Sequence, residues 1–75
     1  MLLISTHIGK RIAFLRKRQG LRQKDLANMA GIRCPRLSNI ETGRNRPSIS
    51  ALVSIATALG LTLNQLIGNR ENKLP

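Results

Sequence analysis

Five glycines divide this chain into segments of helical length, and their spacing limits the fold more than any other feature. Gly20, Gly31, Gly43, Gly60 and Gly68 are separated by stretches in which apolar residues recur every three or four positions, the spacing of one face of an α-helix. No stretch alternates apolar and polar residues over the length of a strand. Because a glycine after an apolar-periodic run is a common helix stop signal, the pattern predicts an all-α domain of five short helices.

The caps and the apolar positions set the expected bounds of these helices. We expect helices over about Thr6–Gln19, Gln23–Ala30, Pro35–Thr42 and Ser48–Gly60, and a fifth from Leu63 onward. Ser48 is the expected N-cap of the fourth helix, and Thr62 and Gln65 have the spacing of a capping box. Pro35 suits the first helical position, which makes Cys34 the expected N-cap of the third helix.

Positive charge is concentrated in the first part of the chain. The 13 lysines and arginines outnumber the three acids, for a formal net charge of +10, and eleven of the 13 precede Pro47. No side chain from Pro47 to Asn69 is charged. Such an excess of positive charge predicts a polyanionic partner, with nucleic acid ahead of an anionic membrane.

The uncharged run from Ile49 to Ile67 has nearly the length of a membrane span, so its pattern separates these two partners. Its first part places an apolar arc opposite the polar side chains of Ser50, Ser54 and Thr57. The arc comprises Ile49, Leu52, Val53, Ile55, Ala56 and Leu59. A spanning helix would be apolar all round, so we expect no membrane partner.

Single copies of three residue types exclude several chemistries. The lone Cys34 cannot form a disulfide framework or a cysteine-based zinc site, and it suits a reducing compartment. One histidine, His7, and three acids offer no metal site and no nucleophile–base pair, so we expect no enzyme activity, no cofactor and no metal. The only aromatic residue, Phe14, argues against modules that stack unpaired bases on aromatic side chains.

Residues 23–42 carry the most informative pattern. Two short helices that cross at a steep angle need a small residue where their backbones approach, which Ala27 supplies. Gly31 stands where the chain must turn at positive φ. The apolar positions of the segment are Leu26, Ala30, Ile32, Leu37 and Ile40.

This pattern, with its flanking segments, resembles the phage-repressor/Cro-like helix-turn-helix family (XRE family). The matching segments are Ile8–Ile12 with Leu15 and Arg16, Gln23–Ala27, Gly31–Ile32, Leu37–Gly43, and Pro47–Ser48 through Leu66. The resemblance implies one lambda-repressor-like domain over residues 1–75, with the helix-turn-helix at about 23–42, a dimerisation part at about 58–68 and a frayed tail over 69–75. It also implies a cytoplasmic, nucleoid-associated homodimer that binds double-stranded DNA at a palindromic operator and regulates transcription, most often as a repressor.

In this kind of docking the start of the third helix enters the major groove. The candidates for base readout are therefore Arg33, Cys34, Pro35, Arg36, Ser38 and Asn39. Asn39 can bond adenine, and Arg36 can take guanine or a phosphate. The plainer alternative is that some of these side chains only face water.

The candidates for phosphate contact are Arg22, Gln23, Arg44, Asn45 and Arg46. Arg22 and Arg33 stand where the family usually has Ser or Thr caps, and a lost hydroxyl cap costs about 1 kcal/mol. Our hypothesis is that phosphate binding offsets this cost. The family pattern also implies that Gln23 braces the recognition helix, and that Arg16 and Glu41 form a structural salt bridge.

The expected dimer or partner surface comprises Leu63, Leu66, Ile67 and Phe14. We also expect a small, uncharged outer face on the fourth helix, formed by Ser50, Ala51, Ser54, Thr57 and Ala58. Phe14 lies off the apolar stripe of the first helix, so it either contacts a partner or packs on Met1–Ile4. A second function therefore stays open: an antitoxin that binds a toxin through these surfaces and represses its own operon.

Overall fold

Five α-helices account for most of the computed structural model, which describes the backbone of residues 2–67 and the side chains of residues 7–67. The helices are α1 (Leu2–Arg18), α2 (Gln23–Ala30), α3 (Cys34–Thr42), α4 (Ile49–Ala58) and α5 (Leu63–Ile67). No strand occurs over residues 2–67, so the expected all-α class is confirmed. The predicted frayed tail, 69–75, and the last residue of the predicted dimerisation part lie outside the described residues.

Two of the predicted helix caps are confirmed. The Ser48 hydroxyl accepts a hydrogen bond from the Ala51 amide at 3.1 Å. At the start of α5 the Thr62 amide donates to Gln65 Oε1 at 2.9 Å, and the Gln65 amide donates to Thr62 Oγ1 at 3.1 Å. Both backbone donors are therefore satisfied by side chains, as a capping box requires.

Two predicted helix starts are wrong. α1 begins at Leu2, four residues before Thr6. The N-cap of α3 is Arg33, with extended φ −77° and ψ 143°, and Cys34 is already helical. Proline is tolerated anywhere in the first turn, because the amide that it lacks would have no helical partner there. Pro35 therefore occupies the second helical position, and the extended residue falls one place earlier than predicted.

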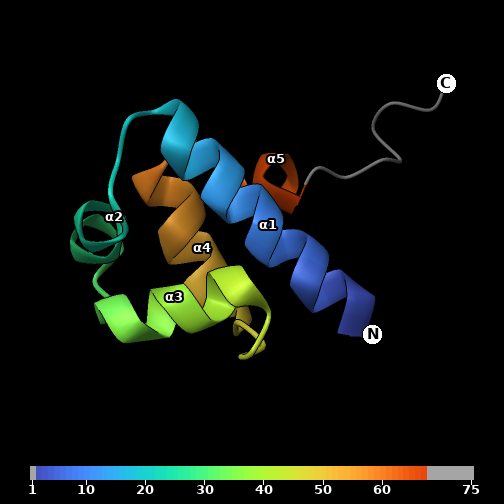
Figure 1. The fold of residues 1–75 in the computed structure, drawn as a ribbon. Coiled ribbons are helices and arrows are strands. Elements are labelled where there is room, and N and C mark those ends of the chain that lie inside the picture. The colour runs from blue at the N-terminus through green and yellow to red at the C-terminus, as the bar shows by residue number, and fades with distance from the viewer. Residues whose placement is uncertain (1, 68–75) are drawn as a thin grey trace, which may run out of the picture.

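The core lies between helices that are distant in sequence, such as α1 and α5, and between consecutive helices, such as α2 and α3. α1 packs against α3 and α5, α2 packs against α3 and α4, and α4 also contacts α5 (Figure 1). The buried residues of this core are Ile8, Ile12, Leu26, Ala27, Leu37, Ile40, Leu52, Ile55, Ala56, Leu59 and Leu66. α1 thus packs on one side of α3, and α4 packs on one side of α2. The opposite side of α3 is uncovered within the described residues.

At Gly9 the backbone of α1 lies directly against the backbone of α3. A Cβ atom built on Gly9 would lie 2.7 Å from the carbonyl oxygen of Glu41 and closer still to that of Ile40. These distances are too short for any side chain, so the absence of one allows the two helices to pack backbone to backbone.

The apolar arc of α4 is buried only in part. Ile49 and Val53, which belong to this arc, are 66% and 45% exposed. Ala51, expected on the outer face, is only 5% exposed. α4 packs against α2 and α5, and the part of its circumference that carries Ile49 and Val53 stays exposed within the described residues.

The N-terminal and C-terminal helices are linked by polar contacts as well as by the core. Arg11 on α1 donates from Nε to the Leu66 carbonyl at 2.8 Å and from Nη2 to the Gln65 carbonyl at 3.1 Å. Gln19 donates to the Leu59 carbonyl, at the end of α4, at 2.9 Å. None of the helices in the described part is long and apolar enough to cross a membrane.

Candidate nucleic-acid interface

Gly31 closes α2 and opens the turn to α3. Its backbone is left-handed, with φ 73°, and its amide donates to the carbonyl of Asn28 at 3.2 Å. The Ile32 amide then donates to the Ala27 carbonyl at 3.0 Å. These bonds satisfy the last carbonyls of α2 while the chain reverses. The turn is three residues long, which fixes α3 closely after α2.

α3 turns one face inward and the other toward solvent. Leu37, Ile40 and Glu41 are buried, as expected. The six candidates for base readout lie on the first turns and the outer side of the helix: Arg33, Pro35 and Arg36 are exposed, and Cys34, Ser38 and Asn39 are half-buried. The structure therefore brings all six together on a single exposed element.

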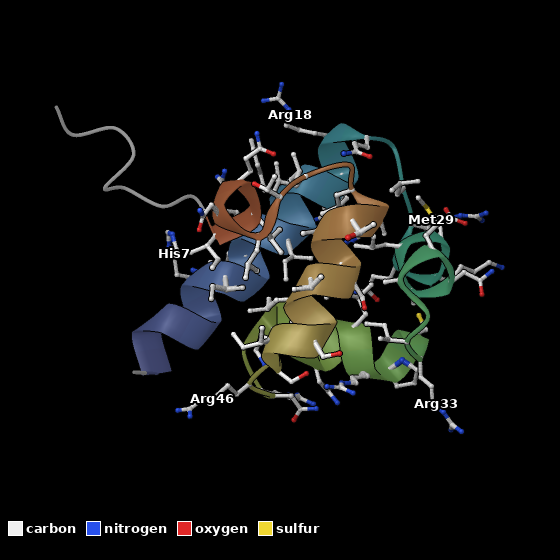
Figure 2. All side chains as sticks on the ribbon, turned by 180° about the vertical axis from the view of Figure 1, so that it is seen from behind. His7, Arg18, Met29, Arg33 and Arg46 are labelled. Atoms are coloured by element: carbon white, nitrogen blue, oxygen red, sulfur yellow. The ribbon has the colours of Figure 1, made fainter. Side chains whose placement is uncertain are left out.

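The loop after α3 holds the second group of basic side chains. Arg44, Asn45 and Arg46 are exposed. The amides of Arg44 and Asn45 both donate to the Asn39 carbonyl, at 2.9 and 3.2 Å, which ties the loop to the C-terminal end of α3. Figure 2 shows Arg33 and Arg46 at opposite ends of α3, on the same side of the molecule, both pointing away from it.

Four arginines on this side have no partner among the described residues. The side chains of Arg33, Arg36, Arg44 and Arg46 form no hydrogen bond or ion pair within residues 7–67. Unpaired guanidinium groups lined along one exposed helix and its following loop make a surface suited to a polyanion.

Arg22, by contrast, is engaged locally. It is the N-cap of α2, and its amide and its Nε both donate to Asp25 Oδ2, at 2.9 and 3.2 Å. The backbone hydrogen bond and then the guanidinium hold the pKa of Asp25 below its ordinary value of 3.8. The Arg22 side chain is 74% exposed, so solvent screens this pair and an anion can still reach the guanidinium.

A buried network of hydrogen bonds holds the inner side of α3 to α1 and α2. Glu41 accepts from Arg16 Nε at 2.8 Å, from Arg16 Nη2 at 3.1 Å and from Gln23 Nε2 at 2.9 Å. The remaining Arg16 nitrogen, Nη1, donates to the Leu21 carbonyl at 2.8 Å. The Arg16–Glu41 salt bridge is therefore present, and Gln23 is the residue that joins α2 to it. Sequence reasoning assigned Gln23 a bracing role but did not find Glu41 as its partner.

Part of the predicted partner surface is wrong. Leu66 is fully buried, because α5 lies with this residue against α1 and α4. Leu63 and Ile67 are half-buried, and Phe14 is 54% exposed. Residues 2–4 continue α1 about 15–18 Å from Phe14 along the same helix axis, at 1.5 Å per residue. They cannot fold back over its ring, so packing on this segment does not account for Phe14.

Ile49 and Val53 are exposed apolar residues that sequence reasoning did not assign to any partner surface. The apolar arc of α4 does not by itself show which of its residues a neighbouring helix covers. Within the described residues there is also no cluster of histidine, cysteine and acidic side chains that could hold a metal ion. Cys34 is a free, half-buried thiol.

Known proteins share both this pattern and this fold. A family model described as Helix-turn-helix (HTH_3) matches residues 12–66. The HTH-type transcriptional regulator DdrOP3 of Deinococcus deserti is 43% identical over 62 residues, which cover 83% of this chain and 48% of the relative. The Immunity repressor protein of Bacillus phage phi105 is 38% identical over 61 residues, covering 81% and 42%. The chain therefore spans less than half the length of these two relatives.

Solved structures agree with the sequence matches. The restriction-modification controller protein C.AhdI from Aeromonas hydrophila superposes with a TM-score of 0.80 at 30% identity, over 81% of this chain and 92% of that one. A chain of the SinR protein/SinI protein complex superposes with a TM-score of 0.77 at 32% identity, over 91% and 67%. The family model matches more than half of this chain, and the solved structures share its fold. This chain therefore belongs to the helix-turn-helix family of XRE-type transcriptional regulators.

Proposed function

We propose that this chain is a sequence-specific binder of double-stranded DNA that represses transcription from a palindromic operator as a homodimer. The observation that supports this most directly is the exposed side of α3. Four arginines without partners among residues 7–67 lie along it and in its following loop, while a buried network holds its inner side to α1 and α2. The relatives named as regulators and as a repressor support the same reading.

Within this proposal the residues divide by what they touch. Arg36, Ser38 and Asn39 face the bases in the major groove, with Arg33, Cys34 and Pro35 at the edge of the groove. Phosphate contacts come from the two ends of the same surface. They involve Arg22, Gln23, Arg44, Asn45 and Arg46. Gln23 also takes part in the buried network, because its side-chain Nε2 donates one hydrogen to Glu41. Its second Nε2 hydrogen remains free to donate to a phosphate.

The homodimer needs a face that a second copy can approach. Two copies of a chain of net charge +10 repel each other where the basic residues before Pro47 would meet. The exposed side of α4 carries no charge and presents Ile49 and Val53, which are 66% and 45% exposed. We assign this side of α4 to the dimer, in place of the buried Leu66.

Selection of bound sites from random duplex DNA tests the proposal. The expected result is a palindromic consensus whose half-sites lie about one helical turn, roughly 34 Å, apart. Because three of the proposed phosphate contacts are arginines (Arg22, Arg44 and Arg46), a dimer would neutralise about six phosphates, and the log–log dependence of affinity on salt would have a slope of about −5.

Arg36→Ala and Arg18→Ala are matched variants for the same assay. Each removes one exposed guanidinium, but Arg18 lies on the side of the molecule opposite Arg33 and Arg46 (Figure 2). Arg36→Ala should weaken binding to the selected site by about tenfold or more, and Arg18→Ala should leave it nearly unchanged. Recovery of only salt-sensitive binding without any consensus would defeat the proposal, as would equal losses for the two variants.

A further inference from the structure

α1 carries an exposed basic face that the proposed DNA surface does not use. At 100° per residue, five side chains fall within about 100° of one another around the helix. They are His7, Lys10, Phe14, Lys17 and Arg18, and all five are exposed. The buried residues of the helix, Ile8 and Ile12 among them, lie on the opposite side. We call these five residues the α1 face.

An aromatic ring stands among the cations of the α1 face. Phe14 is the only aromatic residue of the chain, and it is 54% exposed. The guanidinium carbon of Arg18 lies 5.7 Å from the centre of its ring, within the range of a cation–π contact. The first acid in the sequence is Asp25, so no carboxylate of α1 neutralises these cations.

The α1 face lies away from the helix proposed to meet DNA. In Figure 2, Arg18 projects at the top of the molecule and His7 at the side, whereas Arg33 and Arg46 project at the bottom, at the ends of α3. α3 packs against the other side of α1. A duplex held along the outer side of α3 therefore leaves the α1 face open.

We propose that the α1 face is a docking surface for an acidic segment of another protein that also carries apolar side chains. Carboxylates of the segment pair with Lys10, Lys17 and Arg18, and an apolar side chain covers the Phe14 ring. Phenylalanine and arginine are both enriched at protein interfaces relative to the rest of the protein surface. The opposite charges would speed the encounter and select against basic partners.

Other occupants fit the α1 face less well. A second copy of this chain would bring like charges together, at a net charge of +10 for each molecule. A membrane-surface helix needs a broad apolar side, and this face offers one phenylalanine. Phosphates of a second duplex would pair with the cations but would leave Phe14 exposed.

The test uses the full chain, labelled with ¹⁵N, and a synthetic peptide rich in glutamate with leucines at i and i+4. The control peptide has serines in place of the leucines. We expect the leucine peptide to shift the amide resonances of residues 7–18, and the serine peptide to bind at least about tenfold more weakly. Phe14→Ala should weaken the leucine peptide by a similar factor.

A matched pair of double variants separates the two basic surfaces. Lys10→Gln with Lys17→Gln and Arg33→Gln with Arg46→Gln each remove two exposed charges. The first pair should weaken peptide binding by about tenfold, and the second should change it by less than about twofold. All these side chains are exposed, so unchanged circular dichroism and melting temperature will show that each variant is folded.

Four outcomes would overturn the proposal. They are resonance shifts on α3 instead of α1, equal affinity for the serine and leucine peptides, shifts of the α1 face by a random duplex, and binding of the α1 face to anionic vesicles without binding of the peptide. Because the readout is confined to α1, a failure here leaves the proposed DNA surface untouched, and loss of DNA binding leaves this test intact.

Discussion

Arg16 on α1 and Glu41 on α3 form a two-point ion pair in the interior, with Nε–Oε2 at 2.8 Å and Nη2–Oε1 at 3.1 Å. Their side chains are only 9% and 5% exposed. Gln23 supplies a third donor to Glu41, and the Leu21 carbonyl accepts from Arg16. No buried side-chain nitrogen or oxygen among the described residues is left without a partner. The two charges therefore set how α3 lies on α1 and α2.

Arg16→Met should destabilise the protein by about 3–5 kcal/mol, because it leaves the Glu41 carboxylate buried with Gln23 alone. Urea unfolding followed by circular dichroism measures this loss. The double variant Arg16→Met with Glu41→Leu removes both charges and should recover much of it. A double variant no more stable than Arg16→Met would show that the unpaired charge is not the cause.

Gly9→Ala should lower the free energy of unfolding by about 1–3 kcal/mol. Alanine favours a helix over glycine by about 1 kcal/mol, so the expected loss has the opposite sign to the local propensity. The cause is the Cβ atom, which would meet the Ile40 and Glu41 carbonyl oxygens where α1 crosses α3. Thermal unfolding tests this, with Lys10→Ala on the exposed side of α1 as control. If Gly9→Ala were as stable as Lys10→Ala, α1 and α3 would be able to move apart at little cost in free energy, and the predicted clash would be wrong.

Local signals predicted much of the fold. The Ser48 cap and the Thr62–Gln65 capping box are made by residues three positions apart, so the sequence contains both partners of each bond. Gly31 and Gly43 are local signals as well, because each adopts a positive φ and ends a helix, α2 and α3 respectively. Helix propensity and capping act over about one turn of helix, so they can be recognised in the sequence without knowledge of the tertiary structure.

What the sequence did not predict depends on which neighbour covers which side of a helix. α4 has apolar residues over more of its circumference than α2 and α5 can cover, so periodicity could not say that Ala51 is buried and Val53 exposed. Leu66 was misplaced for the same reason. The Gln23–Glu41 bond joins residues 18 positions apart, and no local pattern specifies such a contact.

Asp25→Asn should flatten the pH dependence of stability in acid. The Arg22 amide and guanidinium lower the pKa of Asp25 in the folded state, so the unfolded chain binds its proton more readily. The stability that this carboxylate contributes is complete above the ordinary pKa of 3.8 and is lost as pH falls through the lower folded pKa. Melting temperatures measured from neutral pH downward should differ between wild type and Asp25→Asn by a constant amount until about pH 4, and should then converge. A gap that persists at lower pH would contradict this.

Arg22→Ser should stabilise the free protein by roughly 0.5 kcal/mol and weaken its binding to DNA. A serine hydroxyl can accept from the α2 amides that Arg22 leaves without a side-chain cap, and this gain exceeds the loss of a screened surface ion pair. The log–log salt slope for a dimer should become shallower by about 2, since one phosphate contact is lost per subunit. Lys17→Ser, which removes a charge from α1, is the control and should leave the slope unchanged. An unchanged slope for Arg22→Ser would show that this arginine is ordinary solvated surface.

Ile49→Glu combined with Val53→Glu should convert the proposed dimer into a folded monomer. Both side chains are largely exposed, so the glutamates should cost the isolated subunit little, while two facing copies would place four carboxylates in one apolar contact. Met29→Glu is the matched control, because Met29 is 55% exposed on α2, on another side of the molecule (Figure 2). Sedimentation equilibrium should give the monomer mass for the α4 double variant and the dimer mass for wild type and Met29→Glu. On DNA, the double variant should still bind a single half-site but lose the cooperative occupation of two. A double variant that sediments as a dimer would move the interface elsewhere, with the half-buried Leu63 and Ile67 of α5 the next residues to replace.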